Sequence, residues 1–317
     1  MHDLWVAHHT GAIVSLLPSA TEIVYALGLE DRLVGVTHEC DFPPQAREKP
    51  HLTASALPLA ASAGEIDRHV RASLHAGSSL YALDSSLLER LAPELIITQE
   101  LCAVCAVSYE IVDRAAKRLR GDPRVVSLEP SSLEDVFANV ETVGALTGTS
   151  SRARAVVDGL RARTRAIRAA VGDRARPRTL VLEWTDPPFS AGHWTPELIE
   201  IAGGIPVLGN PGGDSQTLAW DAIAAADPDV VIVAPCGFDM VTTLRAIDAL
   251  AGAQPVWRTL RAVRSGRAYA IDGNAYVNRP GPRLVETAEL FASALHDERN
   301  GAVARDANAL ARLAIPV

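Results

Sequence analysis

The sequence predicts an α/β protein with mostly parallel sheets, and three observations support this prediction. Short apolar runs that are typical of buried strands alternate with helical patterns along nearly the whole chain. Hydrophobic residues make up 48% of the sequence and charged residues 21%, so the chain can bury a large core. With 317 residues, it is long for one compact domain and suits two lobes of about 150 residues each.

The first half is predicted to form an N-terminal lobe over residues 11–130. It opens with a strand at residues 12–16 and a helix over "PSATEIVYALGL". Ser19 is expected to cap this helix, with Glu22 completing a capping box, and Gly28 to end it. The remaining predicted elements are strands at "RLVGVTH" and "ELIIT", helices over residues 64–91 with Asp84 as a cap, a helix over residues 107–119 and a strand at "RVVSL".

The segment over residues 131–171 is almost entirely helical, and its only break is at "TGTSS". It is too long for an ordinary crossover between strands, so we interpret it as a spine that connects two lobes. The α/β alternation resumes in a predicted C-terminal lobe, residues 177–298, before a tail over residues 299–317. The predicted elements of this lobe are strands at "TLVLEW", "DVVIVAP" and "RAYAID" and helices over residues 196–202, 220–226, 241–251 and from residue 282.

Composition and the first residues argue against several classes of protein. The formal net charge is −8 and no basic stripe with interleaved aromatics is present, so no nucleic-acid partner is expected. No apolar run approaches the roughly 18 residues of a membrane span. The start, "MHDLWVAHHTGAIVSLLPSATE", has no basic region and its apolar run is broken by Pro18, unlike a secretory signal peptide. We therefore expect a cytoplasmic protein whose cysteines are thiols, metal ligands or redox groups rather than disulfides.

All four cysteines follow the C-terminal ends of predicted strands. Cys40 follows "LVGVTH", Cys102 and Cys105 follow "ELIIT", and Cys236 follows "VVIVAP". In open α/β sheets, ligands bind beyond these strand ends. Three thiols come from the first half and one from the second, so all four could meet if the lobes face each other. Four thiolates suit zinc or an iron–sulfur cluster.

The stretch "TQELCAVC" leaves three interpretations open: a shared metal site, a redox pair without metal, and ordinary thiols. A Cys-x-x-Cys turn that enters a helix favours thiolates through the helix dipole, which suits a metal. A thioredoxin-type oxidoreductase fits poorly, because the motif stands alone in a long chain. No catalytic residue is assigned, although Glu39, Glu100 and His193 would be acid–base candidates beside a cluster with an open iron.

Aromatic residues gather in one stretch of the second half. Trp184, His193 and Trp194 bracket "PPFSAG". They fit a pocket wall against a large flat ligand, and packing of the two tryptophans in the core is the alternative.

Five segments together resemble the cobalamin-binding substrate-binding proteins of ABC importers, within the wider group of helical-backbone metal receptors. The segments are "IVSLLPSATEIVYALGLEDRLVGVTHECDFPPQA", "LLERLAPELIIT", "LVLEWTDPPFSAGHWTPELIEIAGGIPVLGN", "IAAADPDVVIV" and "NRPGPRLVETAELFA". They are collinear from about residue 13 to residue 294. The resemblance implies two Rossmann-like lobes joined by a long rigid helix, with a corrinoid ligand in the cleft between the lobes.

The resemblance also implies ligand-binding residues. Pro187, Pro188 and Phe189 stand where the family has Pro-Pro-Phe, and Trp184 stands at the place of a ligand-stacking aromatic. Arg279 matches a ligand-side arginine near the last helix.

Other positions depart from the family. Glu39 replaces an aromatic residue of the ligand wall, Ser215 stands at another aromatic position, and Ala275 replaces an acidic contact. Importer-binding proteins dock through one glutamate on each lobe, and those places hold Ser86 and Asp221, which argues against docking.

Two functions follow from the sequence. The first is a binding protein for cobalamin or another corrinoid, without a secretion signal, that acts as a carrier, scavenger or importer component. The alternative is a cytoplasmic metalloprotein or enzyme on the same scaffold, with an iron–sulfur cluster or zinc held by the four cysteines. An insertion over about residues 55–81, the added thiols and the lost docking acids favour a scaffold adapted to a new role.

Overall fold

The chain forms two compact units, each built on its own sheet, in a computed structural model that describes residues 11–55, 61–75, 80–99, 109–117, 119, 121–296 and 309–314. The first unit comprises Met1–Ala60, Arg68–Pro130 and Phe137–Val157. The second comprises Ala61–Asp67, Ser131–Val136 and Asp158–Val317. This architecture confirms the predicted α/β class.

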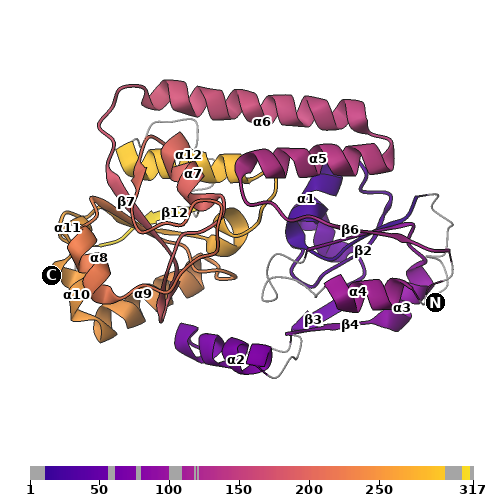
Figure 1. Cartoon of the computed structure of the whole chain (residues 1–317), viewed down its shortest axis with the longest axis horizontal. Helices are drawn as coiled ribbons and strands as arrows, with labels where there is room; N and C mark the ends of the chain where they lie inside the picture. The colour runs from indigo at the N-terminus through magenta and orange to yellow at the C-terminus, as the bar shows by residue number, and fades with distance from the viewer. Residues whose placement is uncertain are drawn as a thin grey trace. The chain divides into compact units, whose positions relative to one another are not determined.

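The first unit contains a four-stranded sheet in the order β2-β1-β5-β6, whose edge strands β2 and β6 are labelled in Figure 1. All of its neighbouring strands are parallel, and Val14 of β1 lies opposite Ile96 of β5. The two central strands are completely buried, which is why their sequences are apolar runs rather than alternating patterns. The strands are β1 (Ile13–Ser15), β2 (Leu33–Val36), β5 (Leu95–Thr98) and β6 (Arg124–Ser127).

Helices cover this sheet on both faces. Leu88 of α3 (Ser85–Leu91) and Val112 of α4 (Tyr109–Ala116) belong to one core cluster with Val14 and Ile96. Figure 1 shows α1 (Pro18–Ala26) on the opposite side of the sheet. The unit also holds a 3-10 helix, η1 (Pro44–Glu48), and an antiparallel pair, β3 (Thr53–Ser55) and β4 (Tyr81–Leu83), with α2 (Ala63–His75) between them in sequence.

The start of α1 corrects one prediction. Leu17 precedes the helix and no side chain caps it, so the expected capping box of Ser19 and Glu22 does not form. Pro18 explains this, because proline at the first helical position has no N–H to satisfy and already has a helical φ. The predicted cap of α3 is confirmed, since the Asp84 carboxylate accepts the N–H of Leu87 at 2.8 Å.

The predicted helical segment consists of α5 (Leu133–Thr147) and α6 (Ser150–Val171). The chain breaks between them at Gly148, whose φ is +76°. This break falls at "TGTSS", as predicted. The division between the two units lies within both helices, so each helix contributes residues to both units.

The second unit contains a six-stranded sheet in the order β12-β11-β10-β7-β8, with β9 also paired to β7; Figure 1 labels β7 and β12. The strands β7, β9, β10 and β11 are parallel, whereas β8 and β12 are antiparallel to their neighbours. β12 lies within the stretch predicted as a tail. The strands are β7 (Arg178–Thr185), β8 (Pro188–Ser190), β9 (Ile205–Pro206), β10 (Val230–Val233), β11 (Ala268–Ile271) and β12 (Leu310–Arg312).

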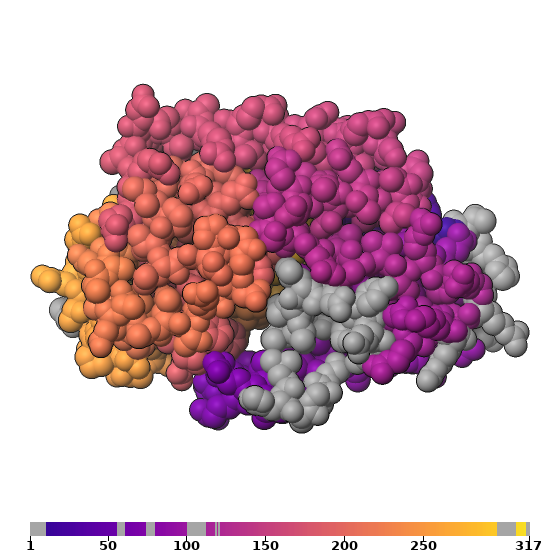
Figure 2. Space-filling view, in the orientation of Figure 1, coloured from indigo at the N-terminus to yellow at the C-terminus, as the bar shows by residue number. Residues whose placement is uncertain are grey.

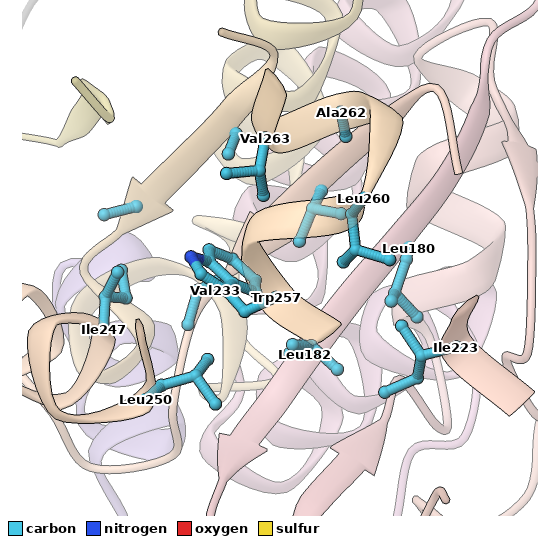
Figure 3. Packing of buried hydrophobic residues seen from close by; sticks show 13 residues of the cluster. Leu180, Leu182, Ile223, Val233, Ile247, Leu250, Trp257, Leu260, Ala262 and Val263 are labelled. Atoms are coloured by element: carbon cyan, nitrogen blue, oxygen red, sulfur yellow. The ribbon is translucent and has the colours of Figure 1, made fainter. Parts of the chain in front are cut away.

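A large core fills one face of this sheet. Trp257 lies among Leu182 and Val233 of the strands and Leu250 of a covering helix (Figure 3). The helices of the unit are α7 (Thr195–Ile201), α8 (Trp220–Ala226), α9 (Met240–Ala253), α10 (Pro255–Thr259), α11 (Arg261–Arg264) and α12 (Leu284–His296), with a one-turn π-helix, η2 (Gly273–Val277). In the space-filling view, the C-terminal part of this unit is visible as an orange to yellow surface (Figure 2). None of the helices in the described part of the chain has both the length and the apolar character that crossing a membrane requires.

Candidate functional site

An aromatic cluster lies where β7, β8 and the loop after β10 meet. The rings of Trp184 and Phe238 are 5.0 Å apart at an interplanar angle of 53°, and Phe189 packs against them. The first turn of α2 adds Ala63 and Ile66 to the same cluster. The structure thus brings together Trp184 and Phe189, both predicted as ligand residues, and adds Phe238.

Two segments of the second unit pair closely beside this cluster, and we call them the front loop (residues 188–195) and the back loop (residues 209–218). The amide of Leu218 donates to the carbonyl of Pro188, and the amide of Ser190 donates to the carbonyl of Gln216, each at 2.8 Å. Phe189 forms an antiparallel bridge with Thr217. The back loop therefore extends the edge of the sheet beside β8.

Glu183 of β7 joins both loops through its carboxyl group. Thr195 donates its hydroxyl to one carboxyl oxygen at 2.7 Å, and the hydroxyl of Ser215 and the amide of Gly192 contact the other. Burial raises the pKa of the Glu183 carboxyl, against these three hydrogen bonds, which lower it. Ser215 thus donates a hydrogen bond to Glu183 at a position where the resemblance leads us to expect an aromatic residue of the ligand wall.

His193, at the turn of the front loop, is held in an unusual conformation. Its φ is +47°, in the left-handed region that non-glycine residues rarely adopt. Its amide donates to the carbonyl of Gly213 at 2.7 Å, and its carbonyl accepts the amide of Gly212 at 2.9 Å. The ring stacks on Trp194, with centroids 5.4 Å apart, and only 18% of the side chain is exposed.

The electrostatics of His193 follow from this position. Burial lowers the pKa of the His193 imidazole, while Asp214, with its oxygen 3.7 Å from Nε2, raises it. Nδ1 is buried and has no hydrogen-bond partner within the described structure. A buried polar atom in a strained loop is typical of a functional position, where a ligand or water completes the bonding.

Arg279 follows η2 and is buried. Its guanidinium group donates to the side-chain oxygen of Asn274 at 3.0 Å. Ala275, which stands at an expected acidic contact, donates its amide to the carboxylate of Asp272 at 2.7 Å. Asp272, the acid closest to position 275 in the sequence, therefore caps η2, and Asn274 of η2 accepts a hydrogen bond from Arg279.

The first unit places Glu39 in a polar cluster at the end of β2. Tyr81 of β4 donates its hydroxyl to the Glu39 carboxylate at 3.2 Å, and the rings of Tyr81 and His38 are 5.6 Å apart. Nδ1 of His38 lies 2.7 Å from the hydroxyl of Thr53. Burial lowers the pKa of the His38 imidazole, and His51 lowers it further, so His38 is neutral at pH 7.

Cys40 is the last member of a chain of hydrogen bonds that runs through the hydroxyl groups of Ser15 and Thr21. Ser15 donates to the carbonyl of Leu17 at 2.9 Å, and Thr21 donates to the Ser15 oxygen at 2.9 Å. Because Thr21 has then used its only hydrogen, the thiol of Cys40, 3.0 Å away, must be the donor to Thr21. With 1% of the residue exposed, this arrangement favours a protonated structural thiol.

The four-cysteine site stays a prediction. Cys40 and Cys236 are free cysteines, whereas Cys102, Cys105 and the nearby Glu100 lie outside the described residues. Within the described ranges, no group of three or more His, Cys, Asp or Glu side chains could hold a metal.

Sequence reasoning missed Glu183, Thr195 and Phe238. The signal for Glu183 was a single acid in the apolar strand "TLVLEW", a position where burial must be compensated by hydrogen bonds. Phe238 gave no comparable signal, because one aromatic residue in a loop is common.

Comparisons with known proteins agree with this architecture. Residues 13–275 match the family described as periplasmic binding protein. A cobalamin-binding protein of Halobacterium salinarum is 27% identical over 290 residues, covering 90% of this chain and 69% of the relative. A vitamin B12-binding protein of Vibrio cholerae is 22% identical over 291 residues, covering 87% and 86%.

Solved structures share the fold. The periplasmic vitamin B12-binding protein of Vibrio cholerae aligns with a TM-score of 0.64 at 20% identity, covering 92% of this chain and 98% of that chain. A periplasmic haem-binding protein of Pseudomonas aeruginosa aligns with a TM-score of 0.69 at 23% identity, covering 91% and 93%.

Proposed function

Since the chain belongs to the periplasmic binding protein family, a family of two-lobed ligand-binding proteins, we propose that it binds cobalamin or a closely related corrinoid. The observation that carries this proposal is the collinear likeness of about nine-tenths of the chain to a protein named as cobalamin-binding.

The aromatic cluster supports a large, flat ligand. Trp184, Phe189 and Phe238 present ring faces and edges that can pack against a macrocycle. Phe189 is the most exposed of the three and is the first candidate for direct contact. Polar groups of the front loop and Arg279 would then fix the orientation of amide or carboxylate groups at the edge of the ligand.

We further propose that binding occurs without the paired-glutamate docking of importer systems, in a carrier or scavenger role within the cytoplasm. Ser86, in the first turn of α3, and Asp221, in the first turn of α8, are both exposed. Only one of the two expected docking positions therefore carries an acid. A relative in Bacillus subtilis is named as an ABC transporter substrate-binding lipoprotein, so importer delivery is the outcome to test against this proposal.

Cobalamin titration tests the proposed ligand directly. We expect hydroxocobalamin to bind stoichiometrically and haemin to bind more weakly at equal concentration. Isothermal titration calorimetry and quenching of tryptophan fluorescence measure both binding reactions. Haemin binding with no response to cobalamin or cobinamide would contradict the corrinoid assignment. Elemental analysis of protein purified without oxygen tests the alternative, because stoichiometric iron or zinc would favour the four-cysteine site.

Substitution of a tryptophan tests whether the ligand binds at the aromatic cluster. Trp184→Leu is expected to weaken cobalamin binding by about tenfold, since an aromatic contact contributes about 0.5–1.5 kcal/mol beyond area burial. Trp220→Leu is the matched control, because Trp220 lies at the start of α8 and packs on a different cluster. Equal losses in the two variants would point to a general effect on folding.

A further inference from the structure

We propose that Glu183 is a positioning residue that fastens the back loop to the front loop and thereby holds His193 in its ligand-competent geometry. The effect on ligand affinity rests on the proposed function, whereas the effect on loop geometry does not.

The first observation is the connectivity of one carboxyl group. Its three donors come from the front loop at Gly192, from the start of α7 at Thr195, and from the back loop at Ser215. No other described side chain contacts both loops in this way through three hydrogen bonds. Replacing the carboxyl group would release all three donors together.

The second observation is the close backbone approach at Gly192. A Cβ atom at this position would lie 2.5 Å from the amide nitrogen of Ser215 and 2.7 Å from the carbonyl oxygen of Gly213. Neither atom can move without shifting the back loop as a whole. The backbones of the two loops therefore approach so closely at Gly192 that only glycine fits there. This close approach lies beside the Glu183 carboxyl group, which binds both loops.

The third observation links the joined loops to His193. Both backbone groups of His193 are bonded to the back loop, at Gly212 and Gly213. Its left-handed φ therefore persists because the back loop holds it in place. If the back loop separated, the imidazole would lose both its burial and its fixed orientation.

The chemistry of Glu183 suits this role. Its donors are two hydroxyl groups and one amide, and no cation is among the groups that shift its pKa. The titratable groups on the two loops packed against it are His193 and Asp214, which interact with each other. A neutral side chain of the same shape should therefore keep the loops joined, so glutamine is the conservative replacement.

Histidine NMR provides a test that needs no ligand. In wild-type protein the pKa of His193, assigned by comparison with His193→Gln, should lie below the ordinary value of 6.5 because the ring is buried. Glu183→Ala and Gly192→Ala should both raise this pKa towards the ordinary value, while Glu183→Gln should leave it low. Glu200→Ala is the matched control, because Glu200 is an exposed acid on the neighbouring helix α7.

Cobalamin affinity, measured on the same proteins, separates the two proposals. Where groups that orient a binding residue are removed from metal sites, affinity typically falls about 10- to 100-fold. We expect a loss of this size for Glu183→Ala and Gly192→Ala, and rescue to within about threefold by Glu183→Gln.

Each outcome has a distinct meaning. If the pKa of His193 is unchanged in both Glu183→Ala and Gly192→Ala, the positioning role is overturned. If only the Glu183 variants lose affinity, and Gly192→Ala and Ser215→Ala bind normally, Glu183 contacts the ligand itself and the proposal is again overturned. If His193 shifts as expected but no variant, including wild type, binds cobalamin, the positioning role stands and the proposed ligand is wrong. Ser215→Ala also covers the case in which Glu183→Ala fails to fold.

Discussion

Replacing Glu183 by glutamine should change how the stability of the protein depends on pH. Burial raises the pKa of this carboxyl group above its ordinary value of 4.5, so the folded protein keeps a proton that the unfolded chain releases. The associated stability is fully present below pH 4.5 and is lost as pH rises through the higher pKa of the folded state. Glutamine carries no such proton, so its contribution is independent of pH.

The magnitude follows from proton linkage. One proton held only by the folded state changes the free energy of unfolding by at most about 1.4 kcal/mol per pH unit. For a unit of roughly 170 residues, each 1 kcal/mol shifts the melting temperature by about 2–4 °C. The melting temperature of Glu183→Gln relative to wild type should therefore rise by up to about 3–6 °C per pH unit between pH 4.5 and the folded-state pKa of Glu183, and should be constant at higher pH. Below that pH, the two proteins should differ by no more than about one hydrogen bond, roughly 1 kcal/mol.

This difference can be measured by thermal unfolding between pH 4 and pH 8, with tryptophan fluorescence as the probe. His193, Asp214 and all other titrating groups are common to both proteins and cancel when the curves are subtracted. Glu200→Gln, at an exposed acid of α7, is the control and should give a flat difference. Parallel curves for wild type and Glu183→Gln would show that Glu183 is ionised in the folded state, and the reasoning about its burial would be refuted.

Three further predictions test the core and the thiols. Trp257→Ala should lower the free energy of unfolding by about 3–5 kcal/mol in urea denaturation, because Trp257 is buried at the centre of the second unit's core. Gly273→Ala should lower the free energy of unfolding by about 1–3 kcal/mol in the same assay, since its Cβ would lie 2.3 Å from a backbone carbonyl oxygen. Gly252→Ala in α9 is the control: its Cβ would meet nothing within 4 Å, so the free energy of unfolding should rise by up to about 1 kcal/mol. In a variant with Cys102 and Cys105 replaced by serine, Cys236 should react quickly with a thiol reagent in the folded protein. Cys40 should react only after unfolding, because it is buried. Two fast-reacting thiols would contradict the buried position of Cys40.

The sequence was sufficient for the elements that hydrophobic periodicity determines. The central strands β1, β5, β7 and β10 and the paired helices α5 and α6 lie where the apolar runs and helical patterns predicted them. These elements are long or fully buried, so their patterns are strong. The Asp84 cap was also predictable, because a capping carboxylate acts on an amide three residues away.

The sequence was insufficient where a neighbour in space decides the structure. Residues 81–83 were included in a helical segment, yet they form β4 because Thr53 to Ser55 supply a partner strand. β8, β9 and β12 are two or three residues long, too short for a period to be detected. The Ser19 cap failed for a local reason, since Pro18 already determines how α1 begins.

The same distinction explains what could and could not be foreseen of the candidate site. The aromatic stretch around "PPFSAG" and the likeness to a family singled out Trp184, Phe189 and His193, which the structure places on β7, on β8 and in the loop that follows β8. Sequence reasoning missed Glu183, whose carboxyl group bonds Gly192 and Thr195 on either side of His193, because a hydrogen-bonded acid and a solvated acid look alike in one dimension.

Cys40 shows most directly why spacing cannot establish a metal site. Its position after β2 matched that of a ligand, but a metal needs a thiolate with an open lone pair. The directions of the hydrogen bonds from Ser15 to Leu17 and from Thr21 to Ser15 leave Cys40 as the donor to Thr21, and a thiolate there would break this chain. A metal held by Cys40 would therefore require Thr21 to turn its hydroxyl towards the sulfur and leave the Ser15 oxygen without its donor. Thr21→Val removes the hydroxyl group that accepts the Cys40 proton and should leave metal content unchanged, because Cys40 is a structural thiol; increased metal content in this variant would contradict that role.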